Sequence, residues 1–320
     1  MQLQYMEITK VDLRELDLDP RSPGWEAACA AVTASMAAHG CVVVACNTLS
    51  PELRQALFNR AMPELFALPV EAKQRNVPTA AFRGYVGQVP GWDYESMEIQ
   101  DVSDTKSVHD FSNLLWPQGN PEFCDTIMSS VRKVLELQHM VEKITLDGLG
   151  VGEESIAAHF KTLTTPSLRL AHYGAPEMGA VTLPAHTDIT VMTGIVQHEV
   201  GGLEVQAKDG SWVTIAPETD TITFLAGETF TVLTNGRVPA CLHRVKTVSN
   251  RDRFSILLNS MTKKGAVVSA MDELVDQENP LMYNPLRTDE YTVFRLSEQG
   301  IKSSNPLKDF CGVDKCGSTV

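Results

Sequence analysis

The sequence predicts a mainly β protein, in which a jelly-roll core is surrounded by a shell of helices. The first observation is a change along the chain, because residues 166–261 contain eight short runs rich in Val, Thr, Ile and Phe, separated by Gly, Asp and Asn. This density of short strands favours a closed or double-sheet β architecture. The second observation is that the flanking segments carry helical patterns. The composition, 43% apolar and 21% charged, is that of an ordinary globular protein.

The N-terminal part is expected to alternate between strands and helices. We predict strands at 7–13 and 41–46 and helices at 24–39 and 51–67. Gly40 can end the first helix, because glycine readily adopts the left-handed conformation found at helix C-termini. Ser50 provides an N-cap for the second helix, and Pro51 suits its first position.

Residues 76–115 show no clear period and are interrupted by Gly84, Gly87, Pro90 and Gly91. Such a segment often forms a loop over a pocket, and this one carries scattered aromatic side chains. A surface loop anchored by those aromatics explains the pattern equally well. Helices are predicted next, at 121–149 and at 153–162, the first because its apolar residues keep a helical spacing.

The core itself is predicted from its short runs. The expected strands are 167–173, 189–196, 202–206, 211–215, 221–225, 229–234, 240–248 and 252–260. Lys208-Asp209-Gly210 and Asn235-Gly236 are typical of hairpin turns. A helix-like pattern returns at 272–300, and we expect the tail after Ser303 to be frayed.

No low-complexity linker interrupts the chain, so we expect one unit over residues 1–320. Its parts are a helix/strand shell with pocket loops at 1–120, helical support at 121–165, the jelly-roll catalytic core at 166–261, and a helical segment with a tail at 262–320.

The charge and the cysteines limit the partners and the compartment. A formal charge of −13 makes nucleic acid and anionic membranes poor partners, although an anionic small molecule could bind beside a local cation. No apolar run is long enough to span a membrane. Seven irregularly spaced cysteines do not suggest a disulfide framework, and no secretory signal is visible. We expect a cytoplasmic monomer that acts on a small molecule.

His186-Thr187-Asp188 and His243 form the first part of a candidate site. In an extended segment the side chains at i and i+2 point to one face, so His186 and Asp188 can converge on one metal ion. His243 lies in a predicted strand and can complete a set of two histidines and one carboxylate. This set is typical of non-haem Fe(II) enzymes and leaves positions open for substrate and oxygen.

Arg253-Phe254-Ser255 forms the second part. Arg253 and Ser255 share a face, and a guanidinium beside a hydroxyl suits a carboxylate. An arginine that points into a β core needs an anion, because an unpaired buried charge is costly. The two parts together predict a 2-oxo acid, bound to the metal at one end and to Arg253 at the other. The alternative is that His186 and His243 are satisfied core histidines and Arg253 belongs to a structural ion pair.

These motifs resemble those of the plant soluble 2-oxoglutarate/Fe(II)-dependent dioxygenase superfamily. The resemblance rests on HTD at 186–188, NGRVPACLHRV at 235–245 and RFS at 253–255. It covers nearly the whole chain, since VDL at 11–13 resembles the family's opening strand and GGLEVQAKDGSWVTIAP at 201–217 resembles the segment between its two metal-binding stretches. WPQGNP at 116–121 and DELVDQENPLMYNP at 272–285 are most similar to the AOP-type branch, known for oxidising glucosinolate side chains.

The resemblance implies a double-stranded β-helix, which is a distorted jelly roll with helices packed outside. It also implies an enzyme that uses Fe(II), 2-oxoglutarate and O2, and that releases succinate and CO2. The substrate would be a small specialised metabolite or hormone-like molecule, altered by hydroxylation, desaturation or dealkylation. His186, Asp188 and His243 would hold iron, Arg253 and Ser255 would bind the distal carboxylate of 2-oxoglutarate, and Tyr173 would assist.

Two positions depart from the family pattern. Ala171 stands where the family frequently has Asn, and Glu228 follows Gly227 where Gly-Asp is usual. Neither change touches the predicted metal ligands or the Arg253–Ser255 pair. They bear on how the cosubstrate is oriented and on the assignment to a branch.

The substrate pocket is predicted from strand periodicity. Asn259 and Met261 share a face with Arg253 and Ser255, and Arg169 shares a face with Tyr173. Arg169 would meet an anionic substrate or, equally, pair with a surface acid. Phe111 from segment 107–112, with Phe82 and Tyr85 from the 82–94 loop, completes the expected lining.

Two other functions remain open on the sequence. One is an Fe(II) oxidase of the same fold that needs no 2-oxoglutarate, in which a substrate carboxylate would occupy Arg253. The other is a non-catalytic jelly roll that binds a small molecule and keeps a structural metal.

Overall fold

The computed structural model describes residues 8–14, 22–78, 83–87, 89, 93–174 and 179–313. Two sheets form the core of the described chain. The large sheet has the order β1 (Lys10–Asp12), β2 (Cys41–Ala45), β9 (Thr221–Ala226), β6 (Met192–Gln197), β11 (Arg253–Thr262), β4 (Thr164–Tyr173) and β3 (Tyr94–Gln100). The small sheet has the order β5 (Val181–His186), β10 (His243–Lys246), β7 (Leu203–Gln206) and β8 (Trp212–Thr214). All these pairings are antiparallel except β1 with β2.

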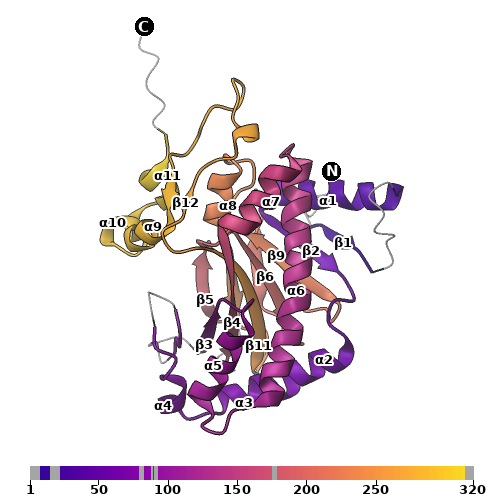
Figure 1. Cartoon of the computed structure of the whole chain (residues 1–320), viewed down its shortest axis with the longest axis vertical. Helices are drawn as coiled ribbons and strands as arrows, with labels where there is room; N and C mark the ends of the chain where they lie inside the picture. The colour runs from indigo at the N-terminus through magenta and orange to yellow at the C-terminus, as the bar shows by residue number, and fades with distance from the viewer. Residues whose placement is uncertain are drawn as a thin grey trace.

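Helices surround this core (Figure 1). The N-terminal half contributes α1 (Pro23–His39), α2 (Pro51–Gln55), the π-helical turn η1 (Ala56–Ala61), α3 (Met62–Phe66), α4 (Val70–Lys73), α5 (Thr105–Leu115), α6 (Pro121–Gly148) and α7 (Glu153–Thr162). The rest contributes α8 (Glu228–Leu233), the 3₁₀ turn η2 (Asp272–Leu274), α9 (Thr288–Arg295), α10 (Glu298–Lys302) and α11 (Pro306–Cys311), with the short strands β12 (Val267–Val268) and β13 (Leu286–Arg287). None of the described helices is both long and apolar enough to cross a membrane.

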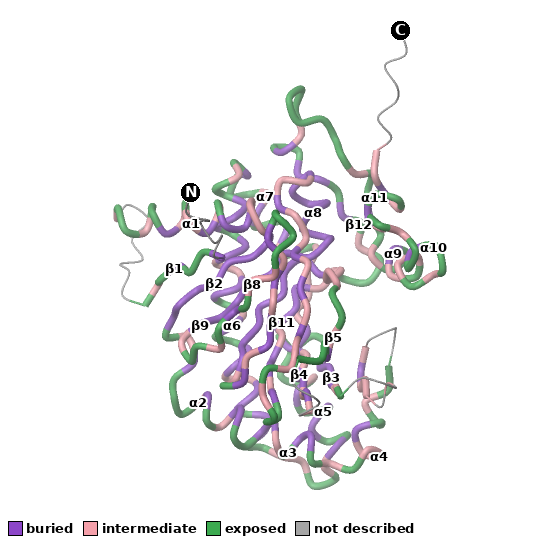
Figure 2. Tube along the Cα trace, turned by 180° about the vertical axis from the view of Figure 1, so that it is seen from behind, coloured by how far each residue is buried: buried purple, intermediate pink, exposed green. Residues whose placement is uncertain are grey.

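The two faces of the large sheet have different partners. On its outer face, side chains such as Leu170, Phe224 and Leu258 belong to the main hydrophobic cluster together with the helices. The long helix α6 lies along this face (Figure 1), and its Gln138 donates hydrogen bonds to Ser260 and to the carbonyl of Met192. The inner face meets the small sheet in smaller clusters, such as Ala171 and Tyr173 with Val245. Figure 2 shows the resulting buried centre and the exposed edge at β5.

Most predicted elements are confirmed where the structure describes them. Ser22 and Pro23 start α1, and Gly40 ends it with a left-handed φ of 61°. Ser50 caps α2, whose helical path continues through η1 and α3. Seven of the eight strands predicted in the core are present, as β4, β6, β7, β8, β9, β10 and β11.

The eighth, 229–234, is wrong, because this segment forms α8. All six residues of α8 are buried, so the helix shows no amphipathic period that would distinguish it from a strand. Its β-branched residues favour a strand only weakly, because β-propensity depends on context. Asn235 and Gly236 do adopt positive φ, but they follow this helix instead of joining two strands.

Other elements were not expected from the sequence. β3 and α5 lie within 76–115, where no period is visible, and β5 ends at His186. The tail after Ser303 is not wholly frayed, since Asn305 caps α11 with Pro306 at its first position. The first 100 residues also supply three strands of the large sheet, so this part does more than cover the core.

Candidate active site

The small sheet places two histidines side by side. His186 ends β5 and His243 begins β10, and the two residues face each other in the antiparallel register. Opposite residues project to the same side of a sheet, and the imidazole centroids here are 4.3 Å apart. The side chains therefore meet although 57 positions separate them in the sequence.

Hydrogen bonds fix the orientation of both rings. The Nδ1 of His186 lies 2.8 Å from the carbonyl of Pro184, and the Nδ1 of His243 lies 3.1 Å from the carbonyl of Cys241. Because a carbonyl can only accept, each Nδ1 carries the proton and each Nε2 keeps its lone pair. The Nε2 atoms lie 3.6 Å and 3.9 Å from Oδ1 of Asp188.

Asp188 presents one oxygen to the histidines and uses the other for orientation. Thr193 on β6 donates a hydrogen bond of 2.6 Å to Oδ2, which leaves Oδ1 toward the rings. Desolvation acts to raise the pKa of Asp188, but the two histidines and Thr193 outweigh it and lower the pKa. Burial, reinforced by the neighbouring His243, lowers the pKa of His186 to about 4.

This group fits a divalent metal ion. Ligand atoms of His186, Asp188 and His243 all lie within 4.8 Å of one another. A metal needs neutral imidazoles and an ionised carboxylate, and the pKa directions of His186 and Asp188 favour those forms. Two nitrogens and one oxygen on one side of an ion leave its other positions open for small ligands. No other cluster of at least three potential ligands occurs in the described residues.

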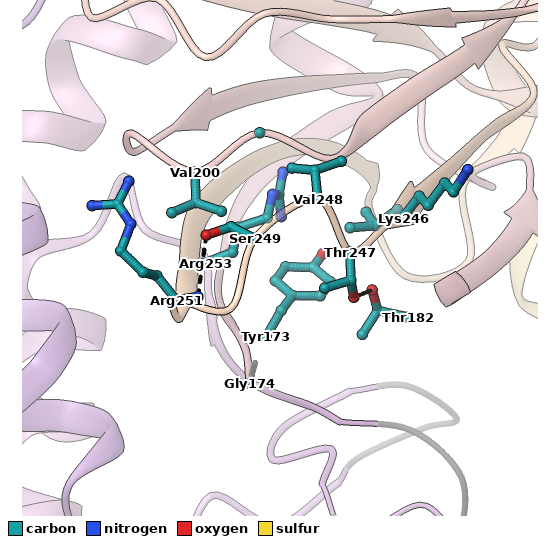
Figure 3. A pocket seen from close by; sticks show the side chains of 12 residues that line it. Tyr173, Gly174, Thr182, Val200, Lys246, Thr247, Val248, Ser249, Arg251 and Arg253 are labelled. Carbon is teal, nitrogen blue, oxygen red and sulfur yellow. Dashed lines mark hydrogen bonds between the residues drawn. The ribbon is translucent and has the colours of Figure 1, made fainter. Parts of the chain in front are cut away.

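The large sheet places a buried cation nearby. Arg253 at the start of β11 is 4% exposed, and its guanidinium lies 4.6 Å from the ring centre of Tyr173 (Figure 3). It donates to Gln197 Oε1 at 2.9 Å and to Ser255 Oγ at 3.3 Å. Its Nε has no hydrogen-bond partner, and within the described ranges no carboxylate forms an ion pair with it.

A buried arginine held only by neutral groups is a site for an anion. Burial lowers the pKa of Arg253, which reflects the cost of the uncompensated charge. Burial also raises the pKa of Tyr173 to about 12, so its hydroxyl stays protonated and can donate to an anion. Tyr173 and Arg253 line a pocket together with Thr182, Val200 and Thr247 (Figure 3).

One strand connects the two parts of the site. Thr193 contacts Asp188 and Gln197 contacts Arg253, and both side chains lie on the inner face of β6, opposite Asn259 and Ser255. Four residues of strand span about 13 Å. Since both side chains reach into the space between the sheets, this separation suits a small molecule with a metal-binding group at one end and a carboxylate at the other.

Three of the predicted substrate-pocket residues share the inner face with this site. β11 pairs with β4 without a register shift, so Asn259 and Met261 project to the same side as Arg253 and Ser255. Arg169 is opposite Leu257 on that face. It donates to Ser96 at 2.8 Å and lies 3.8 Å from the buried carboxylate of Glu98, and it contributes to the lowered pKa of Asp188.

The structure does not bring the other predicted lining residues to the site. Phe111 lies in the main hydrophobic cluster, where it stacks on Phe123 of α6. Tyr85 donates to Glu95 at 3.1 Å, and Glu95 lies on the outer face of β3. The reason is an isolated bridge between Val86 and Ser96, which directs Val86 inward and Tyr85 outward. Phe82 lies outside the described residues.

Gln197 and Thr193 were missed in the sequence. Both lie on β6, and the predicted strand at 189–196 stops one residue before Gln197. Their spacing of four was the available signal, because it places two polar side chains on one face of an otherwise apolar strand. Ala171, in contrast, is fully buried opposite Ser255, where it packs with Tyr173 and Val245.

Comparison with known proteins adds a separate finding. A family model described as the 2OG-Fe(II) oxygenase superfamily matches residues 164–259, which contain both parts of the site. A second, described as the N-terminal region of non-haem dioxygenases in morphine synthesis, matches residues 8–126.

Curated relatives match along nearly the whole chain. The probable 2-oxoglutarate-dependent dioxygenase AOP1 of Arabidopsis thaliana is 32% identical over 301 residues, covering 92% of this chain and 98% of that protein. The 2-oxoglutarate-dependent dioxygenase AOP3 of the same plant is 26% identical, covering 96% of this chain and 98% of that protein.

Solved structures match equally broadly. A rice dioxygenase for auxin oxidation superposes with a TM-score of 0.81 at 27% identity, covering 96% of this chain and all of that one. JOX2, solved with 2OG, Fe and JA, superposes with a TM-score of 0.77 at 22% identity, covering 95% of this chain and 89% of that one. At this lower identity the likeness concerns the fold.

Proposed function

The chain belongs to the 2OG-Fe(II) oxygenase superfamily, and from this we propose that His186, Asp188 and His243 hold its Fe(II) while Arg253 and Ser255 bind 2-oxoglutarate. The enzyme is a 2-oxoglutarate-dependent dioxygenase with a jelly-roll fold, and the predicted resemblance to AOP-type enzymes is confirmed. It uses Fe(II) and 2-oxoglutarate, and it acts on a small molecule.

The metal and the residues have separate tasks in this proposal. When bound, Fe(II) supplies the O2-dependent oxidation that is coupled to the loss of CO2 from 2-oxoglutarate. Pro184 and Cys241 orient the two imidazoles through their carbonyls, and Thr193 orients the carboxylate of Asp188. These hydrogen bonds keep three ligand atoms directed to one point before the metal arrives.

Arg253 carries the proposal that this chain uses 2-oxoglutarate at this position. Its charge is buried, it has no acidic partner among the described residues, and it lies beside a hydroxyl and a phenol that can both donate. A dicarboxylate supplies the missing negative charge at one end and metal-binding oxygens at the other. Tyr173 assists by covering the guanidinium and by offering its hydroxyl to the bound carboxylate.

For the substrate, we propose a small specialised metabolite or hormone-like molecule, in line with the relatives named above. Asn259, Met261 and Arg169 would contact it, because they lie on the inner face of the large sheet next to the cosubstrate residues. An anionic group near Arg169 would have to compete with Glu98 for the guanidinium.

The test follows O2 uptake and succinate release together in purified protein reconstituted with Fe(II). We expect both to require 2-oxoglutarate and to rise when fractions of plant small-molecule extracts contain the substrate. O2 uptake without 2-oxoglutarate would indicate the cosubstrate-independent oxidase instead. No succinate with any fraction would favour the binding protein.

We further propose that the protein works as a monomer in the cytoplasm, without nucleic acid or membrane as partners. The net charge of −13 and the unpaired state of the described cysteines support this. Light scattering after size exclusion would give a mass near 35.1 kDa for a monomer, and twice that mass would reject it.

A further inference from the structure

The residue between two of the proposed metal ligands makes a contact that coordination does not require. Thr187, between His186 and Asp188, donates its hydroxyl to Glu228 Oε1 at 2.7 Å. Glu228 is the first residue of α8 and is only 5% exposed. Its position is one where the family pattern has Asp, so the longer side chain needs a structural reason.

Two residues of the C-terminal helix α9 hold the same carboxylate. Tyr291, which is fully buried, donates to Glu228 Oε2 at 2.8 Å. Arg295 Nε lies 3.6 Å from Oε1, and Arg295 Nη2 lies 3.4 Å from the Thr187 hydroxyl. We call Thr187, Glu228, Tyr291 and Arg295 the Glu228 cluster.

The described side chains that contact this carboxylate carry hydrogen-bond donors. Each of its two oxygens accepts from one hydroxyl, and the Arg295 guanidinium lies 3.6 Å from Oε1. Tyr291 is itself fixed by ring contacts with Phe294 and Phe310. The cluster therefore joins the loop after β5, the start of α8 and the C-terminal helices, although α9 lies outside the part matched by the oxygenase family model.

The backbone at the same place is equally constrained. The N–H of Glu228 donates to the carbonyl of Asp188 at 2.8 Å, and the N–H of Gly227 donates to Val191 at 3.0 Å. A side chain at Gly227 would come within 2.1 Å of the carbonyl of Thr190, so α8 begins directly against this loop. Main-chain and side-chain contacts from the start of α8 thus restrict the turn that carries His186 and Asp188.

We propose that Glu228 is a positioning residue for the metal centre: through Thr187, and supported by Tyr291 and Arg295, it fixes the 186–188 turn in the geometry that binds the metal. This inference rests on the proposed metal site, because it assigns a role to the support of that site. Loss of a residue that orients a metal ligand typically lowers metal affinity by about 10–100-fold. The C-terminal helices then belong functionally to the metal centre.

The test measures metal affinity without turnover. Purified protein is titrated anaerobically with Co(II), whose absorbance reports its coordination, for wild type, Thr187→Val, Glu228→Gln and Tyr291→Phe. Thr187→Val removes the hydroxyl at nearly constant shape, and Glu228→Gln replaces one accepting oxygen with a donor. We expect each of these two to weaken Co(II) binding about tenfold or more, with Tyr291→Phe in the same direction. Glu228→Asp, whose carboxylate can still accept, should recover part of the affinity lost in Glu228→Gln.

The double variant Thr187→Val/Glu228→Gln separates positioning from general stability. If Glu228 acts through Thr187, the double variant binds Co(II) no more weakly than the worse single variant. Additive losses, or losses in melting temperature without any change in Co(II) affinity, would overturn the inference.

A matched control is Glu95→Gln. Glu95 is likewise a carboxylate held by a tyrosine hydroxyl and a cation, Tyr85 and Lys73, and it lies 3.2 Å from His172, but on the outer face of the large sheet. The Glu95→Gln variant should leave Co(II) affinity within about twofold of wild type, since none of these described contacts involves the 186–188 turn. If wild type itself binds no Co(II), the proposed metal site fails, whereas wild-type binding with unchanged variants rejects only the role of Glu228.

Discussion

Individual side chains of the proposed metal site are oriented by atoms that are not among its proposed ligands. The carbonyls of Pro184 and Cys241 and the hydroxyl of Thr193 leave one free ligand atom on each of His186, His243 and Asp188. An ion bound there meets a preorganised set, so little conformational entropy is lost on binding. Removing any one of the three side chains should therefore weaken metal binding strongly while it changes the stability of the folded protein much less.

We expect His186→Ala, Asp188→Ala and His243→Ala each to abolish turnover while circular dichroism stays that of the wild type. Asp188→Ala should be the most damaging to metal content, because it removes the only negative charge among the three ligands. Metal analysis of the purified variants measures this. His139→Ala, a histidine of α6 that contacts Phe160, serves as the control. Near-normal activity in any two of the three ligand variants would contradict the metal assignment.

Arg253→Lys tests the cosubstrate assignment. Lysine offers a point charge where a planar guanidinium can bind a carboxylate with two parallel hydrogen bonds, and it also loses the contact with the Tyr173 ring. We expect the half-saturating concentration of 2-oxoglutarate to rise more than tenfold, which is about 1.4 kcal/mol or more. The half-saturating concentration of the substrate should change less.

The control for this variant is Arg251→Lys. Arg251 lines the same pocket but is largely exposed and pairs with Glu199 at the surface. Exposed pairs contribute little, so its 2-oxoglutarate titration should match the wild type. An unchanged titration of Arg253→Lys would reject the role given to Arg253.

For single residues, the sequence predicts the candidate site where polar or charged side chains stand in otherwise apolar strands. His186, Asp188, His243, Arg253 and Ser255 stand in short motifs whose spacing already predicts a shared face. The spacing of Gln197 and Thr193 places them on one face, but their partners, Arg253 on the neighbouring strand and Asp188 in the loop before β6, could not be read from it. A sequence read along one strand contains no information on register with the next.

Among the elements, β11 separates the residues that we propose to meet a substrate from those that face α6. It runs for ten residues without a bulge, so its two faces alternate strictly from Arg253 to Thr262. Met261 projects inward with Arg253, whereas Ser260 projects outward to Gln138 and Glu142 of α6. Of these two adjacent residues, one therefore faces the space between the sheets and the other faces the helical layer.

This alternation predicts different effects for neighbouring variants. Met261→Ala and Arg169→Ala should change the ratio of product to consumed 2-oxoglutarate, because both remove contacts from the inner face, while 2-oxoglutarate affinity stays nearly intact. Ser260→Ala should lower stability by about 1–3 kcal/mol, since it leaves buried partners unsatisfied, and should not alter coupling. Coupling assays and urea unfolding distinguish the two. If both inner-face variants couple like the wild type, these positions do not line the pocket.

The elements that sequence reasoning missed share a physical cause. β3 carries Ser96 and Glu98 on its inner face, and both are buried beside Arg169 of the neighbouring strand β4. Buried polar residues break the alternation of apolar and polar positions on which strand prediction depends. α8 fails for the opposite reason, because a segment buried on all sides shows no period at all.

In the whole molecule, the site is divided between the two sheets. The small sheet supplies both histidines, and the large sheet supplies Arg253, Ser255 and Tyr173. The fold class follows from strand density and family resemblance, and the strands at 7–13 and 41–46 were predicted, but β3 and the division of the site between the sheets were not. A ligand that contacts the histidines and Arg253 at once must connect the two sheets. Its binding should therefore change the melting temperature of the protein.

We expect Mn(II) and 2-oxoglutarate together to raise the melting temperature more than the sum of their separate effects. Each ligand binds the folded chain only, and a ligand at about 100 times its dissociation constant stabilises by about 2.7 kcal/mol. The excess arises because 2-oxoglutarate would bind the metal with one end and Arg253 with the other, so that each bound partner strengthens the other. Mn(II) prevents turnover during the scan, and succinate, which lacks the 2-oxo group, provides the ligand control. Arg253→Lys should keep the rise with Mn(II) alone and lose most of the excess. Strictly additive shifts in the wild type would mean that the two halves of the site bind their ligands independently, and the bridging arrangement between the sheets would then be wrong.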